Sequence, residues 1–344
     1  MDVQTGISVA MIVKNEAITL SRALDSVARI VDEIIVVDSG STDATVSLAK
    51  LHPSCPKVYE TKWNDDFSEL RNYAISLCTY SYCLMLDADE FIAEGSRKLL
   101  RHLIYSAMES DNNSLFAPLI DNLDGTTLVN NPRIFRIRET LNYKGRVHEY
   151  LNEDGECHVK YIHDIVINHT GYNEETYNKK KKESRNLYLL RKQIADDPVN
   201  LRWYYFLFRY LEEDSPESIQ ILNKFGELSL PYPDAIEVYA FNLKTMLIMH
   251  LMVKNEFKQA FNHARQLYSH YKDRNSTILF MVTSLVNSMD GFEEKIINYI
   301  EDAKNLSGIH EDNLLHVRAP DDYVQKCLMY IMMRLDRIRT SYEQ

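Results

Sequence analysis

Three carboxylates follow a short apolar run in the segment "YCLMLDADEF", at Asp87, Asp89 and Glu90. Carboxylate oxygens bind Mg²⁺ and Mn²⁺, and proteins commonly hold these ions through one or two carboxylates together with phosphate oxygens of the substrate. Asp87 and Asp89 therefore predict a divalent-cation site that binds a diphosphate. The alternative is that both residues simply end a strand at the surface. Glu90 is interpreted as the acidic start of the following segment.

The elements that would position these aspartates are strands alternating with helices. Continuous apolar runs rich in β-branched residues are typical of strands buried on both faces of a parallel sheet. The predicted strands are 7–13, 33–38, 57–61 and 82–87. The predicted helices are 16–28, one that begins at 41–43 and one over 65–77, where Asp66 and Glu69 form a capping pair.

This order of elements predicts right-handed crossovers and a doubly wound α/β sheet that is mixed but mostly parallel. Ligands of open α/β sheets bind beyond the carboxyl ends of the strands. Asp38 ends the second predicted strand and Asp87 ends the fourth. We therefore expect both aspartates at one edge of the sheet.

The second half of the chain has a different pattern. Short mixed segments over 114–170 predict antiparallel strands that close the same domain. From about residue 174 the sequence becomes almost wholly helical, in three helix pairs whose spacing is similar to that of tetratricopeptide repeats. The last of these pairs is predicted over 276–306. We expect an α/β domain over 1–175 and an all-α domain over 176–344.

Composition excludes several classes of protein. The chain has a net charge of -11 and no evident basic face, which argues against nucleic-acid binding. The basic run at 179–182 is interpreted as a solvated helix start, the alternative being a patch that faces phosphate or lipid. Five scattered cysteines are expected to be reduced. Because we find no signal peptide and no apolar stretch near the ~20 residues of a membrane span, we expect a cytoplasmic protein.

Several motifs together resemble a known family. The segments "MIVKNEA", "VVDSGSTDAT", "DDFSELRN" and "MLDADE", in this order, resemble the inverting glycosyltransferases of family 2, which have the GT-A fold. The resemblance covers about 6–172. With "GRVHE", "NHTGY" and the helical tail, the chain is similar to the SunS-type peptide S-glycosyltransferases of glycocin bacteriocin biosynthesis. It also resembles family 2 transferases with tetratricopeptide tails and, more loosely, lipopolysaccharide-core glucosyltransferases.

The resemblance implies a nucleotide site for a UDP-sugar. Asp38 would contact the base or ribose, although it could instead cap the next turn. Glu16 would meet the ribose hydroxyls or only supply charge at a helix start. Arg71 would neutralise phosphate or hold Asp87, the alternative being a surface arginine. The residues expected to line this site are Val13, Asn15, Glu16, Asp38, Ser39, Arg71, Asp87 and Ala88.

The resemblance also implies a metal site and a general base. Asp89 would be the principal ligand of Mg²⁺ or Mn²⁺, joined by Asp87 and by His169, which could instead be structural. The usual Glu-Asp dipeptide of the base is not apparent between 120 and 150. The candidates for the base are Glu149, Asp121 and His148. Glu149 is the preferred one, although it could be no more than an exposed strand carboxylate.

The expected function is metal-dependent inverting transfer of a hexose from a UDP-sugar to a Cys or Ser side chain of a bacteriocin precursor peptide. The helical domain would bind the acceptor or form a homodimer, because stacked helix pairs make concave binding surfaces. One alternative acceptor is a lipopolysaccharide-core or other glycan. An alternative of a different class is a non-catalytic helical-repeat scaffold.

Overall fold

The computed structural model describes residues 4–272, apart from 112, 124, 154–157, 171–175, 213 and 227, together with 277, 280 and 283. The chain divides into two units, Met1–Gln193 and Ile194–Gln344. The predicted domain boundary at 175/176 borders residues that are not described. The cysteines at 157 and 327 and, apart from the three single positions, the predicted helix pair at 276–306 also lie outside the described residues.

Four parallel strands form the first part of the sheet, as the apolar runs predict. They are β1 (Gln4–Val13), β2 (Glu33–Asp38), β3 (Lys57–Glu60) and β4 (Tyr80–Met85), in the order β3-β2-β1-β4. Every residue of β2 is buried, because helices cover both faces of the sheet. In the described chain, nine strands make one sheet whose order continues β8-β6-β11-β5, with β7 paired to β6.

The later strands are mixed in direction, which corrects part of the sequence prediction. They are β5 (Glu90–Ile92), β6 (Leu115–Asp121), β7 (Thr127–Leu128), β8 (Ile134–Arg136) and β11 (Val159–His169). β8 is antiparallel to both β4 and β6, and β5 is antiparallel to β11, as expected. β11, however, is parallel to β6. A separate hairpin-like pair joins β9 (Leu141–Lys144) and β10 (Tyr150–Glu153).

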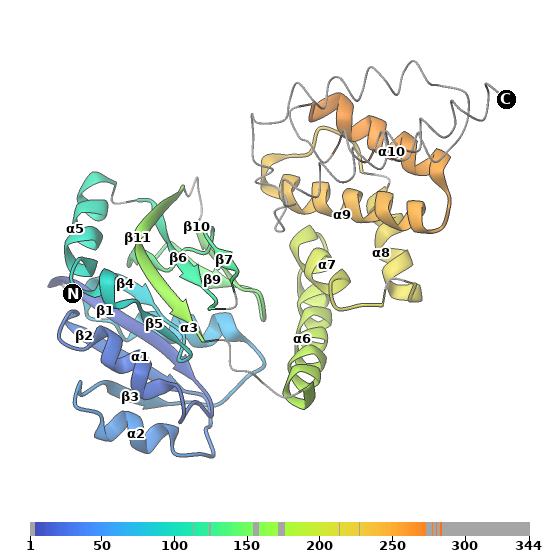
Figure 1. The fold of residues 1–344 in the computed structure, drawn as a ribbon. Helices are drawn as coiled ribbons and strands as arrows, with labels where there is room; N and C mark the ends of the chain where they lie inside the picture. Colours follow the sequence, from blue (N-terminus) through green and yellow to red (C-terminus); the bar gives the residue numbers. More distant parts are fainter. Residues whose placement is uncertain are drawn as a thin grey trace. The chain divides into compact units, whose positions relative to one another are not determined.

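Helices pack on both faces of this sheet (Figure 1). The first unit contains α1 (Leu20–Val27), α2 (Thr45–Leu51), α3 (Phe67–Ser76), α4 (Glu94–Arg97) and α5 (Leu100–Ser110). One core cluster joins α1 and α5 to the sheet through side chains such as Leu24 and Ile104. The other joins α3 through Leu70 and Ala74. The sheet is therefore buried on both sides, as a doubly wound architecture requires.

The first residues of α3 and α1 can be compared with the starts that the local sequence predicts. Asp66 caps α3 as predicted, since its side chain accepts a hydrogen bond from the Glu69 backbone N–H. The Glu69 side chain, the expected capping-box partner, instead accepts a hydrogen bond from Asn64 Nδ2 at 2.9 Å. α1 begins only at Leu20, later than the predicted start at residue 16. The segment before it forms turns in which the Thr19 hydroxyl donates to the Glu16 carboxylate. Glu16 is therefore held near the sheet edge and lies outside the helix.

The second unit is helical where it is described. α6 (Thr176–Asp196) crosses the division between the units and is followed by α7 (Leu201–Phe208), α8 (Pro216–Gly226), α9 (Asp234–Val253) and α10 (Phe257–His270). α9 packs against α7, α8 and α10. Its window Ile236–Val253 is long and apolar enough to span a bilayer by composition, with mean hydropathy 1.3, and half of it is buried in the fold. This corrects the expectation of no such stretch; a core helix has the same composition.

Candidate active site

The carboxyl ends of six parallel strands lie at one edge of the sheet. β8 is antiparallel to β4 and to β6, so β4 and β6 run in the same direction and end on the same side. β11 is parallel to β6, with Asn168 opposite Asp121 in the register. The edge therefore brings together Asp38, the turn after β4, Asp121 and His169, as the positions of the predicted residues require.

Asp89 is fixed on two sides by the His-Thr pair that ends β11. Its Oδ2 atom lies 3.2 Å from His169 Nε2. The backbone carbonyl of Asp89 accepts hydrogen bonds from the backbone N–H of Thr170, at 3.1 Å, and from its hydroxyl, at 2.9 Å. The other ring nitrogen of His169 lies 2.9 Å from Asn122 Oδ1. The hydrogen bond with Asp89 raises the pKa of His169.

Asp89 and His169 are the groups that could hold a divalent cation. Both side chains are partly exposed, at 27% and 32%. Among the residues that the structure describes, no three His, Cys, Asp or Glu side chains form a metal-binding group. Two protein ligands fit an ion that is completed by phosphate oxygens and water. A carboxylate with an imidazole suits Mn²⁺ better than Mg²⁺, which prefers oxygen.

Asp87 lies between two buried arginines. Its Oδ1 is 2.9 Å from Arg71 Nη1, and its Oδ2 is 3.0 Å from Arg133 Nη2. Burial opposes ionisation, but the charges of Arg133 and Arg71 outweigh it and hold the pKa of Asp87 well below its usual range. Both carboxylate oxygens are thus bound to guanidinium groups, and this geometry favours Asp89 over Asp87 as the metal ligand.

Glu90 is a buried member of the same cluster, which corrects its interpretation as the acidic start of the next segment. The residue is 3% exposed. Its Oε1 lies 2.7 Å from Arg133 Nη2, and its Oε2 accepts a hydrogen bond from the Asp87 backbone N–H. Burial raises the pKa of Glu90, and the charge of Arg133 opposes that effect. Arg133 was not among the predicted site residues, although it begins "RIFRI", one of the short segments over 114–170 that predict strands.

The loop after β2 is held by its own hydrogen bonds. Asp38 Oδ2 accepts from the backbone N–H groups of Gly40 and Ser41, both at 2.9 Å, and Asp38 Oδ1 accepts from the Ser41 hydroxyl. This is the turn-capping alternative that the sequence left open. The Ser39 hydroxyl donates to the Val13 carbonyl, so the predicted pocket residues Val13 and Ser39 join β1 to β2.

Asn15 and Glu16, which follow β1, lie beside this loop and are hydrogen-bonded to it and to the start of α2. Asn15 has a φ of 57°, the left-handed region that Asn tolerates better than most residues. Its side-chain oxygen accepts a hydrogen bond from the Thr42 backbone N–H at 2.7 Å. Burial and the charges of Asp89 and Asp87 raise the pKa of Glu16, and the Thr19 hydrogen bond opposes them. The Glu16 carboxylate therefore interacts electrostatically with those of Asp87 and Asp89. Ala88, which lies between the two aspartates in the sequence, is buried.

The three candidates for the base lie in two places. Glu149 Oε1 is 2.6 Å from Arg71 Nε, and its side chain is 12% exposed. Arg71 therefore links Glu149 directly to Asp87. His148 precedes it with a φ of 54°. Asp121 ends β6 and accepts a hydrogen bond from the Leu123 backbone N–H, next to the Asn122 side chain that contacts His169.

The loop that carries Glu149 is held by α6 within the first unit. The Arg146 backbone N–H donates to Gln193 Oε1 at 2.9 Å, and the Arg146 carbonyl accepts from the Phe67 backbone N–H at 3.0 Å. Lys192 Nζ lies 3.1 Å from Asp65 Oδ2. The part of α6 before the division at 193/194 therefore contributes to the candidate site.

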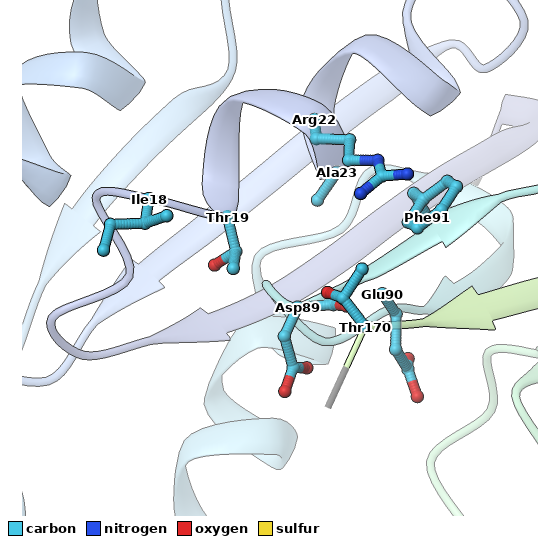
Figure 2. A pocket seen from close by; sticks show the side chains of 8 residues that line it. All are labelled: Ile18, Thr19, Arg22, Ala23, Asp89, Glu90, Phe91 and Thr170. Atoms are coloured by element: carbon cyan, nitrogen blue, oxygen red, sulfur yellow. The ribbon is translucent and has the colours of Figure 1, made fainter. Parts of the chain in front are cut away.

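A pocket of about 170 Å³ borders Asp89 between the start of α1 and β5. Figure 2 shows the Arg22 guanidinium over the ring of Phe91, with its central carbon 3.6 Å from the ring centroid. The Asp89 carboxylate points away from that pair (Figure 2). The pocket therefore adjoins the candidate site at Asp89.

Comparison with known proteins assigns this domain to a family. Residues 8–160 match the family described as glycosyl transferase family 2. This part of the chain belongs to glycosyltransferase family 2. The family 2 domain contains Asp38, Asp87, Asp89 and Glu149 within the matched range, whereas His169 lies beyond its end.

Individual relatives are similar over part of their length. Glycosyltransferase SunS from the SPbeta prophage of Bacillus subtilis is 30% identical over 225 residues, 63% of this chain and 52% of the relative. A TPR repeat-containing protein of Synechococcus elongatus is 30% identical over 202 residues, 56% of this chain and 49% of the relative. The chain thus spans about half the length of these curated relatives. Residues 1–349 of S. aureus TarS have 12% identity and a TM-score of 0.41, covering 89% of this chain and 93% of that one.

Proposed function

We propose that the chain is a metal-dependent inverting hexosyltransferase. It takes a hexose from a UDP-sugar and transfers it to a Cys or Ser side chain of a bacteriocin precursor peptide. The observation that carries this proposal is the contact between Asp89 and His169 at the carboxyl edge of the sheet, within 3.2 Å, in a chain with a family 2 domain. A partly exposed carboxylate and imidazole at this edge suit a nucleoside diphosphate bound through a cation.

The residues around that pair supply binding and orientation. The loop formed by Asp38 and Asn15 would receive the nucleoside, and its fixed turn needs no rearrangement to do so. Asp89 and His169 would hold Mn²⁺ or Mg²⁺, which supplies positive charge to the diphosphate. Thr170 keeps the Asp89 backbone in place through two hydrogen bonds. Preorganised groups of this kind lower the barrier because they need not reorient during the reaction.

Inverting transfer is a single displacement at the anomeric carbon. The acceptor sulfur or oxygen attacks that carbon while the bond from carbon to the diphosphate oxygen breaks, and UDP leaves with the electron pair. The proton of the acceptor passes to a base, for which Glu149 is our first candidate and Asp121 the second. A cysteine acceptor makes a weaker demand on the base, since the thiolate forms more readily than an alkoxide.

The most specific part of the proposal is that the acceptor is a peptide. It is supported by the motif resemblance to peptide S-glycosyltransferases and by the helical unit, whose α8, α9 and α10 pack in sequence. Stacked helix pairs present extended surfaces that suit an unfolded peptide. Homodimerisation through this unit and a cytoplasmic location belong to the same proposal.

A donor and acceptor screen tests the proposal. UDP-hexoses would be incubated with the full chain and a precursor peptide carrying Cys, Ser or Ala at the acceptor position, with Mn²⁺, Mg²⁺ or a chelator. We expect a hexose mass increase on the Cys peptide that requires the metal. Transfer only to a glycan would replace the peptide acceptor with the glycan alternative. No hydrolysis and no transfer with any UDP-sugar would contradict the enzyme and favour the scaffold.

A further inference from the structure

We propose that Arg133 is a positioning residue for the nucleotide and metal site, a role that rests on the proposed function. It would hold Asp87 and Glu90 together so that the turn from 87 to 90 presents Asp89 to His169. Arg133 itself is 6% exposed, and its Nη2 atom contacts the side chains at both ends of this turn, Asp87 and Glu90. It therefore acts through the aspartates and does not touch the donor.

One guanidinium nitrogen joins the two carboxylates. Arg133 Nη2 lies 3.0 Å from Asp87 Oδ2 and 2.7 Å from Glu90 Oε1. Two further hydrogen bonds close the turn, from the Asp87 backbone N–H to Glu90 Oε2 and from the Glu90 backbone N–H to the Asp87 carbonyl, both at 3.0 Å. Asp89 stands inside this closed turn, so the direction of its carboxylate depends on the groups on either side of it.

The backbone of Arg133 is itself fixed by two strands. Its carbonyl accepts a hydrogen bond from the Met85 backbone N–H at 2.8 Å, at the end of β4. Its own N–H donates to the Phe116 carbonyl in β6 at 3.0 Å. The guanidinium is thus anchored to the sheet core, while the turn that it holds is at the edge.

The ion pairs of Arg133 with Asp87 and Glu90 are poorly arranged for stability alone. Within the described part of the chain, the buried Nε of Arg133 has no hydrogen-bond partner. A buried ion pair with an unsatisfied donor contributes little stability, because desolvation offsets the attraction between the charges. Asp87 already has a second arginine, Arg71, at 2.9 Å. What Arg133 adds is the connection between Asp87 and Glu90, and hence the geometry of the turn.

Three variants separate positioning from stability. Arg133→Met removes the guanidinium and leaves Glu90 as a buried carboxylate without its cation. The double variant Arg133→Met with Glu90→Gln also removes the charge of residue 90. The amide oxygen of the new glutamine side chain can still accept a hydrogen bond from the Asp87 backbone N–H. Arg136→Met is the matched control, since Arg136 ends β8, the strand that directly follows Arg133, and is exposed. Each variant is measured for thermal unfolding and, by calorimetry, for UDP affinity in the presence of Mn²⁺.

We expect Arg133→Met to be less stable than the wild type and to bind UDP with Mn²⁺ more weakly by roughly 10- to 100-fold. The double variant should recover most of the stability but not the affinity, and Arg136→Met should match the wild type in both. Recovery of affinity together with stability in the double variant would overturn the inference. So would an Arg133→Met protein that binds UDP as the wild type does, and the proposed function would then stand. A wild type that binds no UDP would overturn both.

Discussion

Asp89 and His169 are separated by 80 positions in the sequence, yet Asp89 Oδ2 lies 3.2 Å from His169 Nε2. The contact forms because β4 and β11 run in the same direction and both end at one edge of the sheet. It is reinforced by Thr170, which donates two hydrogen bonds to the Asp89 carbonyl. His169 and Thr170 thus contact Asp89 directly.

Removal of Arg71 should have a large effect on stability. Arg71→Met leaves Glu149 and Asp87 without the guanidinium that now lies 2.6 Å from one and 2.9 Å from the other. Breaking a buried pair by deleting one partner costs about 3–5 kcal/mol. Denaturant unfolding would measure it. Arg97→Met is the control, since its partner Glu94 is 81% exposed, and it should change the free energy of unfolding by about 1 kcal/mol or less.

Glu149→Gln should lower turnover far more than donor affinity. The amide can keep a hydrogen bond to Arg71, so the loop should stay in place, but it cannot accept the proton of the acceptor. Steady-state kinetics with a peptide acceptor and calorimetry with UDP measure the two quantities separately. The same substitution in the rival base, Asp121→Asn, should leave turnover nearly unchanged. The reverse result, a slow Asp121→Asn enzyme and a normal Glu149→Gln enzyme, would assign the base to Asp121.

Glu33 should make stability depend on pH in the acid range. Burial raises its pKa, but hydrogen bonds from Lys57, Thr79 and Ser8 outweigh burial and lower it below the ordinary 4.5. A carboxylate with a lowered native pKa contributes stability that is present above its unfolded pKa and is lost as the pH falls through the native value. Glu33→Gln should therefore be less stable than the wild type at pH 7, and unfolding curves should converge below pH 4.5. A stability difference that does not change with pH would contradict this.

Gln193→Ala should loosen the loop that carries Glu149. The substitution leaves the Arg146 backbone N–H without its partner at 2.9 Å, a loss of about 1 kcal/mol in a partly buried setting. We expect faster amide hydrogen exchange over 143–149 and a lower kcat, with donor KM little changed. Unaltered exchange in that segment would show that α6 does not hold the loop.

Much of the sheet and the site could be predicted from sequence because the signals were local. The apolar runs over 7–13 and 33–38 specify strands buried on both faces, and strands of that kind imply where Asp38 and Asp87 must lie. Asp66 and Glu69 specify the start of α3 in the same local way. The direction of β11 was not predictable, since alternation of side chains marks a strand but carries no information on which way it runs.

Burial of charge was the main feature that the sequence could not indicate. Glu90 looks like one more surface acid until Arg133, 43 positions away, is placed beside it. Likewise, nothing near Glu149 shows that its partner is Arg71, 78 positions earlier. Such pairs depend on which strands become neighbours, and β8 between β4 and β6 was not anticipated. Asp38 differs, because both its possible roles were visible in the sequence. The structure contains the turn cap, and the contact of Asp38 with a base or ribose stays a prediction.

The most direct test of the central claim compares the wild type with Asp89→Ala in Mn²⁺-dependent turnover of a UDP-hexose, with thermal unfolding as the control for folding. We expect turnover by the wild type that a chelator removes. We expect no turnover by Asp89→Ala at an unfolding temperature close to that of the wild type. A folded Asp89→Ala protein that keeps metal-dependent turnover would contradict the assignment of Asp89 and the site built around it.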